Sequence, residues 1–358
     1  MAILRRRARW LGMAGAAGIA LARLAFAAES PAPVVPGTIA PIAFDRYSPL
    51  AESNEILRRT STPIAAAKVF DYLHANEERL PDQGVKLADE RFWIYVPRSE
   101  PPPAGYGLFV FVPPWDGGSV PQEWRRVFDK YGLIYVASQH SGNDEPMLWR
   151  RMPLALHAVE NVRSRYPVDP SRIYISGFSG GSRTAMRLAL TYPDVFRGAV
   201  LNSGSDPFGV PGIAVPPGDL FRLFQERSRM VVVSGTEDLF IDARDAAMFD
   251  AADRLCVFGL DRQPMLHTSH ALMRPVMLDR ALEWLERPDP RASRHAEALA
   301  RCRAGVDAKI AEGLGHVRDL LAQGRKTQAG EALSKIDQAY GGLAAPQSVE
   351  LARQVLAK

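Results

Sequence analysis

The segment 172–190, RIYISGFSGGSRTAMRLAL, constrains the fold of this chain more than any other stretch. Its first residues are β-branched or aromatic, which favours a buried strand, and residues 182–190 have the composition of a helix. Between them, a glycine-rich turn surrounds Ser179. A strand that enters a helix through one tight turn is a building unit of parallel sheets, with the turn at the carboxyl edge of the sheet. The segment therefore predicts an α/β fold with Ser179 at that edge.

Two kinds of chemistry use a turn of this type. A phosphate-binding loop requires Gly-x-x-x-x-Gly-Lys-Ser/Thr, and here Ser182 and Arg183 occupy the positions of the second glycine and the lysine. The pattern Gly-x-Ser-x-Gly, in contrast, is complete at 177–181. Its glycines let strand and helix approach closely while a strained backbone lifts the serine hydroxyl clear of the sheet. We therefore interpret Ser179 as a nucleophile rather than a serine in an ordinary turn.

A serine nucleophile needs a histidine base. One known arrangement runs along the chain in the order serine, acid, histidine, with the histidine in a loop after the last strand. His267 and His270 satisfy this order, and we prefer His270 because it directly precedes the amphipathic stretch 273–286. His267 lies nearer the strand and is assigned to the substrate side or to structure. The other histidines precede the serine or lie in helical stretches: His74, His140, His157, His295 and His316.

The base in turn needs an orienting carboxylate. Asp238 follows the apolar run of VVVSGTEDLF and so falls just past the carboxyl end of a strand, where catalytic groups gather in α/β sheets. Asp206, after the preceding strand, is the alternative. Glu237 is expected to point the other way, and Asp242 and Asp245 suit the start of a helix.

An oxyanion hole needs two N–H groups aimed at the developing negative charge. Gly180, directly after the nucleophile, is expected to supply one of them. The second is expected from the loop PPWDGG, where Pro113 and Pro114 have no N–H, so Trp115 or Asp116 is the donor. Side chains expected to border the substrate pocket are Phe178, Trp115 and His267.

Residues 1–27 have the pattern of a secretory signal peptide. Arginines precede the apolar run WLGMAGAAGIALA, and the small-residue site AFA ends it. Removing the five arginines of this segment takes the net charge from +4 to −1, which does not point to a nucleic-acid partner. We expect a periplasmic or secreted protein without a stable membrane span after cleavage. An uncleaved anchor and twin-arginine export remain the alternatives.

The chain has two cysteines, Cys256 and Cys302. Export permits a disulfide between them, and two unrelated buried thiols are the alternative. The partner spacings of a zinc site are missing.

The chain divides into four expected parts: the signal 1–27, an N-terminal extension 28–85, an alternating α/β region 86–287 and a helical region 288–358. Residues 28–50, rich in proline and alanine, are expected to be an exposed leader, and 54–80 a helix broken at Pro63. Strands are expected at 91–97, 107–113, 133–138, 172–176, 198–204 and 230–235, with a last short one at 256–260 or 264–267, and helices at 147–166, 182–192, 243–255 and 273–286. The first two strands could form an antiparallel hairpin.

Residues 90–287 resemble the α/β-hydrolase superfamily, in particular its bacterial secreted esterase and polyhydroxybutyrate-depolymerase-like branch. The resemblance rests on FWIYVP, VDPSRIYISGFSGGSRTAMRLALTYPDVFRGAV, SGTEDLF and the SHAL…ALEWL ending. It implies a triad of Ser179, Asp238 and His270 that hydrolyses small or medium esters through an acyl-enzyme, without a metal or organic cofactor. Ser269 stands where the family has glycine before its histidine, and the oxyanion loop lacks the His-Gly-Gly-Gly run of many lipases.

Two other functions compete with a carboxylesterase. A serine peptidase shares the fold and the serine motif, but the sequence shows no acidic anchor for a peptide amino terminus. A hydrolase fold without activity, used for binding through its helical tail, is the non-enzymatic alternative.

Overall fold

The computed structural model describes residues 34–288 and 292–356. These residues fall within one unit, Ala32–Lys358. The expected signal peptide 1–27 lies outside the described residues. Among the helices that are described, none combines the length and apolar character that a membrane span requires.

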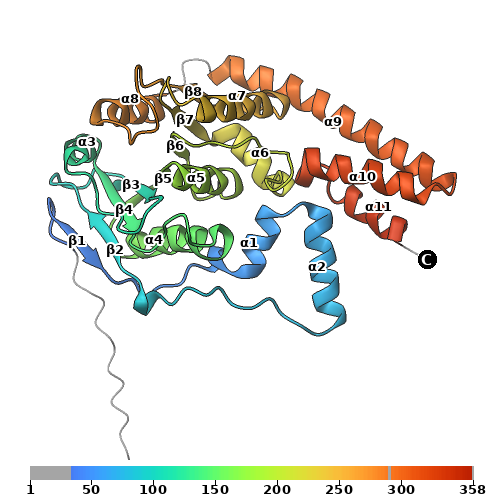
Figure 1. Ribbon diagram of the computed structural model, residues 1–358, viewed down its shortest axis with the longest axis horizontal. Coiled ribbons are helices and arrows are strands. Elements are labelled where there is room, and N and C mark those ends of the chain that lie inside the picture. Colours follow the sequence, from blue (N-terminus) through green and yellow to red (C-terminus); the bar gives the residue numbers. More distant parts are fainter. Residues whose placement is uncertain (1–33, 289–291, 357–358) are drawn as a thin grey trace, which may run out of the picture. The chain divides into compact units, whose positions relative to one another are not determined.

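One eight-stranded sheet forms the centre of the structure (Figure 1). In spatial order its strands are β1 (Ile39–Ile42), β2 (Phe92–Tyr95), β4 (Leu133–Ser138), β3 (Tyr106–Val112), β5 (Val168–Phe178), β6 (Gly198–Asn202), β7 (Arg229–Val233) and β8 (Leu260–Arg262). The pairs β1–β2 and β2–β4 are antiparallel, and every pair from β4 to β8 is parallel. This order is that of the α/β-hydrolase fold, so the predicted fold class is confirmed.

Helices cover both faces of the sheet. The helices α4 (Met152–Arg165), α5 (Gly180–Thr191), α6 (Gly218–Arg227) and α7 (Leu239–Arg254) lie on one face, and α3 (Arg125–Tyr131) and α8 (Pro275–Glu286) lie on the other. Further helices precede and follow these: α1 (Ser53–Thr60), α2 (Pro63–Ala75), α9 (Ala292–Ala322), α10 (Lys326–Tyr340) and α11 (Gln347–Leu356). Side chains of β3 alternate between the two faces: Leu108 and Val110 join a core with α4 to α7, and Phe109 and Phe111 join one with α3 and α8. All seven residues of β3 are buried, as a central strand of a covered sheet requires.

Several sequence expectations were wrong. Residues 28–50 are not simply an exposed leader, because β1 pairs with β2 as an edge strand, where Pro41 is tolerated. The alternative of a hairpin between the first two core strands does not hold, since β4 lies between β2 and β3. The last strand is 260–262, which is neither of the two segments expected, and the helices α3 and α6 were not predicted.

The N-terminal extension is anchored to α4. Phe44 is buried in the core, and the Ser48 N–H donates to Nδ1 of His157 at 2.9 Å. Nε2 of His157 lies 2.9 Å from Oε1 of Gln83, so the buried ring bridges two parts of the extension. Because the ring is desolvated, the pKa of His157 is lowered to about 4.

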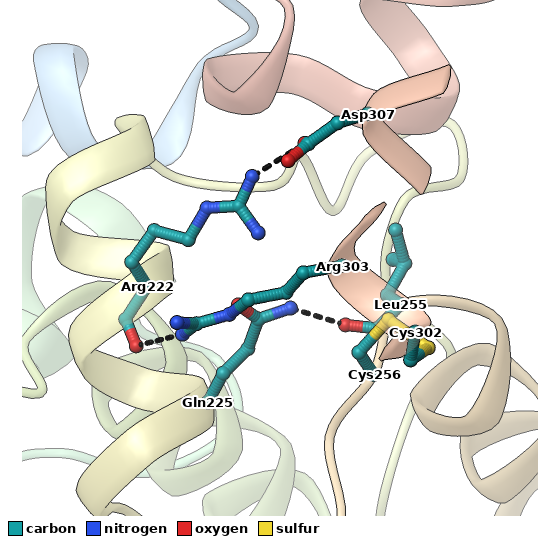
Figure 2. Close-up of a disulfide and its surroundings, with 7 residues drawn as sticks. All are labelled: Arg222, Gln225, Leu255, Cys256, Cys302, Arg303 and Asp307. Carbon is teal, nitrogen blue, oxygen red and sulfur yellow. Dashed lines mark hydrogen bonds and ion pairs between the residues drawn. A yellow bond between two sulfur atoms is a disulfide. The ribbon is translucent and has the colours of Figure 1, made fainter. Parts of the chain in front are cut away.

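The three C-terminal helices have their own small core and are fastened to the sheet region (Figure 2). A disulfide joins Cys256, just after α7, to Cys302 in α9. Beside it, Arg222 of α6 pairs with Asp307 at 2.5 Å, and Arg303 donates to the Arg222 carbonyl at 2.8 Å.

The same helices also reach the N-terminal extension. Oδ1 of Asp337 in α10 accepts from the N–H of Ile64 at 3.3 Å, and Arg353 of α11 pairs with Asp71 of α2 at 3.2 Å. The helical region therefore contacts both the α/β region and the N-terminal extension.

Candidate active site

Ser179 occupies the single residue between β5 and α5. Its backbone has φ 54° and ψ −120°, a conformation that residues other than glycine rarely adopt. Its N–H donates to the Asn202 carbonyl at 2.9 Å, and its carbonyl accepts from the Arg183 N–H at 3.2 Å. These two hydrogen bonds hold the strained turn from β6 and from the helix, so the position of the hydroxyl is fixed by the backbone.

The glycines around Ser179 are explained by close backbone contacts. A Cβ at Gly177 would overlap the backbone of Gly181, and a Cβ at Gly181 would overlap the carbonyl of Val112 in β3. The start of α5 therefore lies directly against β5 and β3, which is the packing that the Gly-x-Ser-x-Gly spacing predicts.

Asp238 and His270 are brought together by the loops after β7 and β8. Oδ2 of Asp238 lies 2.5 Å from Nδ1 of His270, and its Oδ1 accepts from the Ile241 N–H at 3.4 Å as the cap of α7. A Cβ at Gly235 would overlap the Thr268 carbonyl, so the two loops are in direct contact. The imidazole is 40% exposed, which places the pair at an open surface.

An aromatic row connects this pair with the expected oxyanion loop. The His270 ring lies 5.0 Å from the ring of Phe178, which in turn lies 5.9 Å from that of Trp115. Phe178 directly precedes Ser179, so the three predicted triad residues and Trp115 gather at the carboxyl edge of the sheet. No hydrogen bond joins the Ser179 hydroxyl to His270 within the described residues, as is common before substrate is bound.

Two of the other candidates lie elsewhere. The His267 side chain is 93% exposed, and its Nδ1 lies 3.8 Å from Oε1 of Glu237. The structure thus does not place His267 with Phe178 and Trp115. Asp206, the alternative acid, is buried and pairs with Arg187 at 2.7 Å rather than with a histidine.

Backbone N–H groups are free at the positions expected for the oxyanion hole. Those of Gly180, Trp115 and Asp116 donate no hydrogen bond to any described residue. Oδ1 of Asp116 accepts from the Gly142 N–H at 3.2 Å, which holds the loop against its neighbour. A Cβ at Gly180 would overlap the side-chain amide of Asn143, so this amide borders the Gly180 N–H. Asn143 lies in an irregular loop that carries no sequence pattern, and sequence reasoning missed it.

A buried arginine joins the backbone segments of the site. Arg151, 3% exposed, donates to the carbonyls of Ser141 at 2.8 Å, Pro113 at 3.1 Å and Gly180 at 3.4 Å. No carboxylate of the described residues pairs with it, and burial lowers its pKa to about 10. Its guanidinium therefore holds three loops together and places a positive charge beneath them. An arginine inside the apolar stretch MLWRRMPLALHAV was the available signal.

Asn202 ties the serine turn to the histidine loop. Its Nδ2 donates to the Ala271 carbonyl at 3.2 Å and its Oδ1 accepts from the Met273 N–H at 2.7 Å. Its backbone carbonyl is the one that accepts from Ser179. This buried residue thus positions Ser179 relative to the loop that carries His270, and it too was missed.

The site offers a hydroxyl, an imidazole–carboxylate pair and unpaired N–H donors, which together are the groups that acyl transfer uses. Across residues 34–288 and 292–356, no three His, Cys, Asp or Glu side chains are grouped as a metal site would require.

Comparison with known proteins gives short matches. No family model matches the chain. It is 44% identical over 46 residues to poly(3-hydroxyalkanoate) depolymerase C of Paucimonas lemoignei, a match that covers 13% of this chain and 11% of that protein. It is 28% identical over 98 residues to poly(3-hydroxybutyrate) depolymerase of Ralstonia pickettii, covering 24% of this chain and 20% of that protein. The chain thus spans a fifth or less of the length of these curated relatives.

Two solved structures of hydrolases also align with this chain. One is an S-formylglutathione hydrolase of Staphylococcus aureus, at 12% identity and a TM-score of 0.41, covering 55% of this chain and 92% of that one. A ferulic acid esterase aligns at 16% identity and a TM-score of 0.43, covering 55% and 91%.

Proposed function

We propose that this protein is a serine hydrolase that cleaves carboxylic esters with Ser179, His270 and Asp238. In this mechanism Ser179 Oγ attacks the ester carbonyl carbon while Nε2 of His270 takes the hydroxyl proton. His270 then gives that proton to the departing alcohol, which leaves an acyl-enzyme. Water, deprotonated by His270, attacks the acyl carbon. His270 then gives this proton to Ser179 Oγ as the bond between Oγ and the acyl carbon breaks, which releases the acid and restores the serine hydroxyl.

The observation that carries the proposal is the 2.5 Å contact of Asp238 with His270 beside a serine at φ 54°. The carboxylate fixes the proton on Nδ1, so that Nε2 is left as the acceptor for the serine proton. The charge that develops on the substrate oxygen would be received by the Gly180 N–H and by that of Trp115 or Asp116. Arg151, which is cationic at neutral pH, adds a positive potential below these donors.

Small or medium esters are the expected substrates, and the exposed His270 and Trp115 would also admit a longer ester chain. The curated relatives make an oligomer of 3-hydroxybutyrate the natural test compound. We also propose that the protein works in the periplasm or outside the cell. The pattern of residues 1–27 supports this, as does the disulfide, because disulfides persist mainly in oxidising compartments.

The proposal is tested with a fluorophosphonate probe and a series of p-nitrophenyl esters of increasing chain length, beside the corresponding anilide. We expect the wild-type protein to be labelled and to hydrolyse esters, and Ser179→Ala to do neither. Equal labelling of the two proteins would contradict the assignment of Ser179 as the nucleophile. Anilide turnover as fast as ester turnover would instead indicate a peptidase, and a folded but inert wild-type protein would indicate a binding function.

A further inference from the structure

Three arginines surround one buried carboxylate next to the candidate active site. Asp206 is 2% exposed and follows β6. Nη1 of Arg187 lies 2.7 Å from its Oδ2, Nε of Arg183 lies 3.8 Å from its Oδ1, and Arg244 of α7 donates a hydrogen bond to the same Oδ1. Among the described residues no other carboxylate pairs with these arginines, so the cluster carries two positive charges in excess.

The neighbouring acids do not cancel this excess. Asp242 pairs with Arg262, and Asp245 is buried, with its Oδ1 accepting from Ser205 at 2.5 Å. Burial raises the pKa of Asp245, so its charged form is disfavoured.

The arginines also repel one another. Burial and the charge of Arg183 lower the pKa of Arg187 to about 10, and burial and both neighbouring arginines lower the pKa of Arg244. The Nε groups of Arg183 and Arg244 are buried without a hydrogen-bond partner in the described residues. An anion bound here would relieve the repulsion and supply an acceptor to the guanidinium groups.

The cluster lies between the two helix starts that carry the candidate catalytic groups. Arg183 is one helical turn, about 6 Å along the axis, beyond Ser179. Arg244 is in the second turn of α7, whose cap is Asp238. Phe240, 62% exposed, lies between the two arginines, with its ring 6.0 Å from Cζ of Arg183 and 5.4 Å from Cζ of Arg244. Arg183 and Arg244 are themselves partly exposed, whereas Arg187 is more buried and holds Asp206.

We propose that Arg183 and Arg244 form a subsite for a carboxylate of the substrate, so that the preferred ester bears a free carboxylate a few bonds from the scissile carbonyl. This inference rests on the proposed ester hydrolysis. The guanidinium N–H groups would donate to the carboxylate oxygens, and Phe240 would contact the carbon chain between the carboxylate and the ester. Two substrate classes have this chemistry: monoesters of dicarboxylic acids, with the carboxylate on the acyl side, and linear hydroxy-acid oligomers, with it on the alcohol side.

Two pairs of esters separate these classes. The acyl-side pair is p-nitrophenyl hydrogen glutarate and its methyl ester, and the alcohol-side pair is the 3-hydroxybutyrate dimer and its methyl ester. We expect wild-type kcat/KM to favour the free acid at least tenfold in one pair. Arg183→Gln and Arg244→Gln should each reduce that preference about tenfold, since each removes a charge-assisted hydrogen bond. Added salt should reduce the wild-type preference in the same direction.

Arg262→Gln is the matched control. Arg262 pairs with Asp242 of α7, the helix that also carries Arg244, and its replacement should leave the preference for the free acid unchanged. If Arg183→Gln does not fold, Arg183→Lys is measured in its place. This variant keeps the charge and should retain part of the preference for the free acid. The subsite is rejected if wild-type protein prefers the free acid in neither pair. It is also rejected if Arg183→Gln and Arg244→Gln show the same preference for the free acid as Arg262→Gln.

A binding measurement keeps this test separate from that of the proposed function. Calorimetry on Ser179→Ala with monomethyl glutarate and with the 3-hydroxybutyrate dimer should show binding of at least one of them, and adding Arg183→Gln to this variant should weaken that binding about tenfold. If wild-type protein hydrolyses none of the four esters, the proposed function fails, and this measurement alone decides whether the carboxylate subsite exists. Equal binding by both proteins, or no binding by Ser179→Ala, rejects it.

Discussion

The imidazole of His270 and the carboxylate of Asp238 meet at 2.5 Å, although the two residues come from loops after different strands. A second histidine–carboxylate pair, His267 with Glu237, lies beside them in the same two loops, but at 3.8 Å and largely exposed. The exposed pair of His267 and Glu237 can therefore serve as a control when the role of His270 and Asp238 is tested.

Asp238→Asn should lower kcat for a p-nitrophenyl ester by about 10³- to 10⁴-fold, because the amide no longer holds the His270 proton on Nδ1. Glu237→Gln, one residue away, should change kcat less than about twofold, since an exposed ion pair contributes little. Steady-state kinetics of both variants make the comparison. Similar losses in the two variants would contradict the assignment of Asp238.

Arg151→Met should lower kcat by about 10²-fold with a smaller change in KM, because the charge beneath the oxyanion donors acts mainly on the transition state. Arg151→Lys should recover part of that loss. Arg150→Met is the matched control, as Arg150 pairs with Glu90 at 2.7 Å and Glu145 at 2.9 Å, away from the three loop carbonyls. A loss of stability in Arg151→Met with unchanged kcat would show that this arginine is structural only.

The buried His157 should make stability depend on pH. Its ring accepts from the Ser48 N–H in the folded state, and its pKa is about 4, well below the ordinary value of 6.5. The unfolded chain therefore binds a proton that the folded chain does not between these values, so this contribution is complete above pH 6.5 and is lost as the pH falls toward 4. The full loss is about 3 kcal/mol.

Urea unfolding at pH 7.5, 5.5 and 4.5 measures this dependence. His157→Gln should show a flatter profile than wild-type protein, whereas the exposed His316→Gln should follow it. Parallel profiles for wild type and His157→Gln would be incompatible with the buried neutral ring.

Cys256→Ser with Cys302→Ser should lower the free energy of unfolding by about 4 kcal/mol, because the disulfide closes a chain of 46 residues in the unfolded state. Ester hydrolysis under native conditions should stay within about twofold of wild type, since neither cysteine contacts the site. Denaturation of the wild-type protein with and without dithiothreitol provides a second measurement. An unchanged midpoint in both experiments would contradict a stabilising role.

The fold was largely predictable because short sequence patterns indicate most of its strands and helices. Parallel strands buried on both faces appear as short apolar runs such as 107–113, and the serine turn needs glycine at fixed positions. Strand adjacency is different. β4 lies between β2 and β3 because the sheet places a later strand between two earlier ones, and no feature of 91–113 encodes that order.

The parts of the site that sequence reasoning missed depend on distant contacts. Arg151 has partners in three loops, at residues 113, 141 and 180, and Asn202 joins positions near 179 and 271. Neither residue belongs to a recognisable motif, so their roles become visible only when the loops are seen together. The candidate nucleophile, in contrast, could be proposed from five consecutive residues.

The contacts of Ile64 with Asp337 and of Asp71 with Arg353 make the packing of α2 depend on the last helices of the chain. They join residues 273 and 282 positions apart, so α2 can make them only when α10 and α11 are present. A chain stopped before α10 would leave α2 without these contacts. Folding that begins at the first helix is therefore complete only after the last helix has been made.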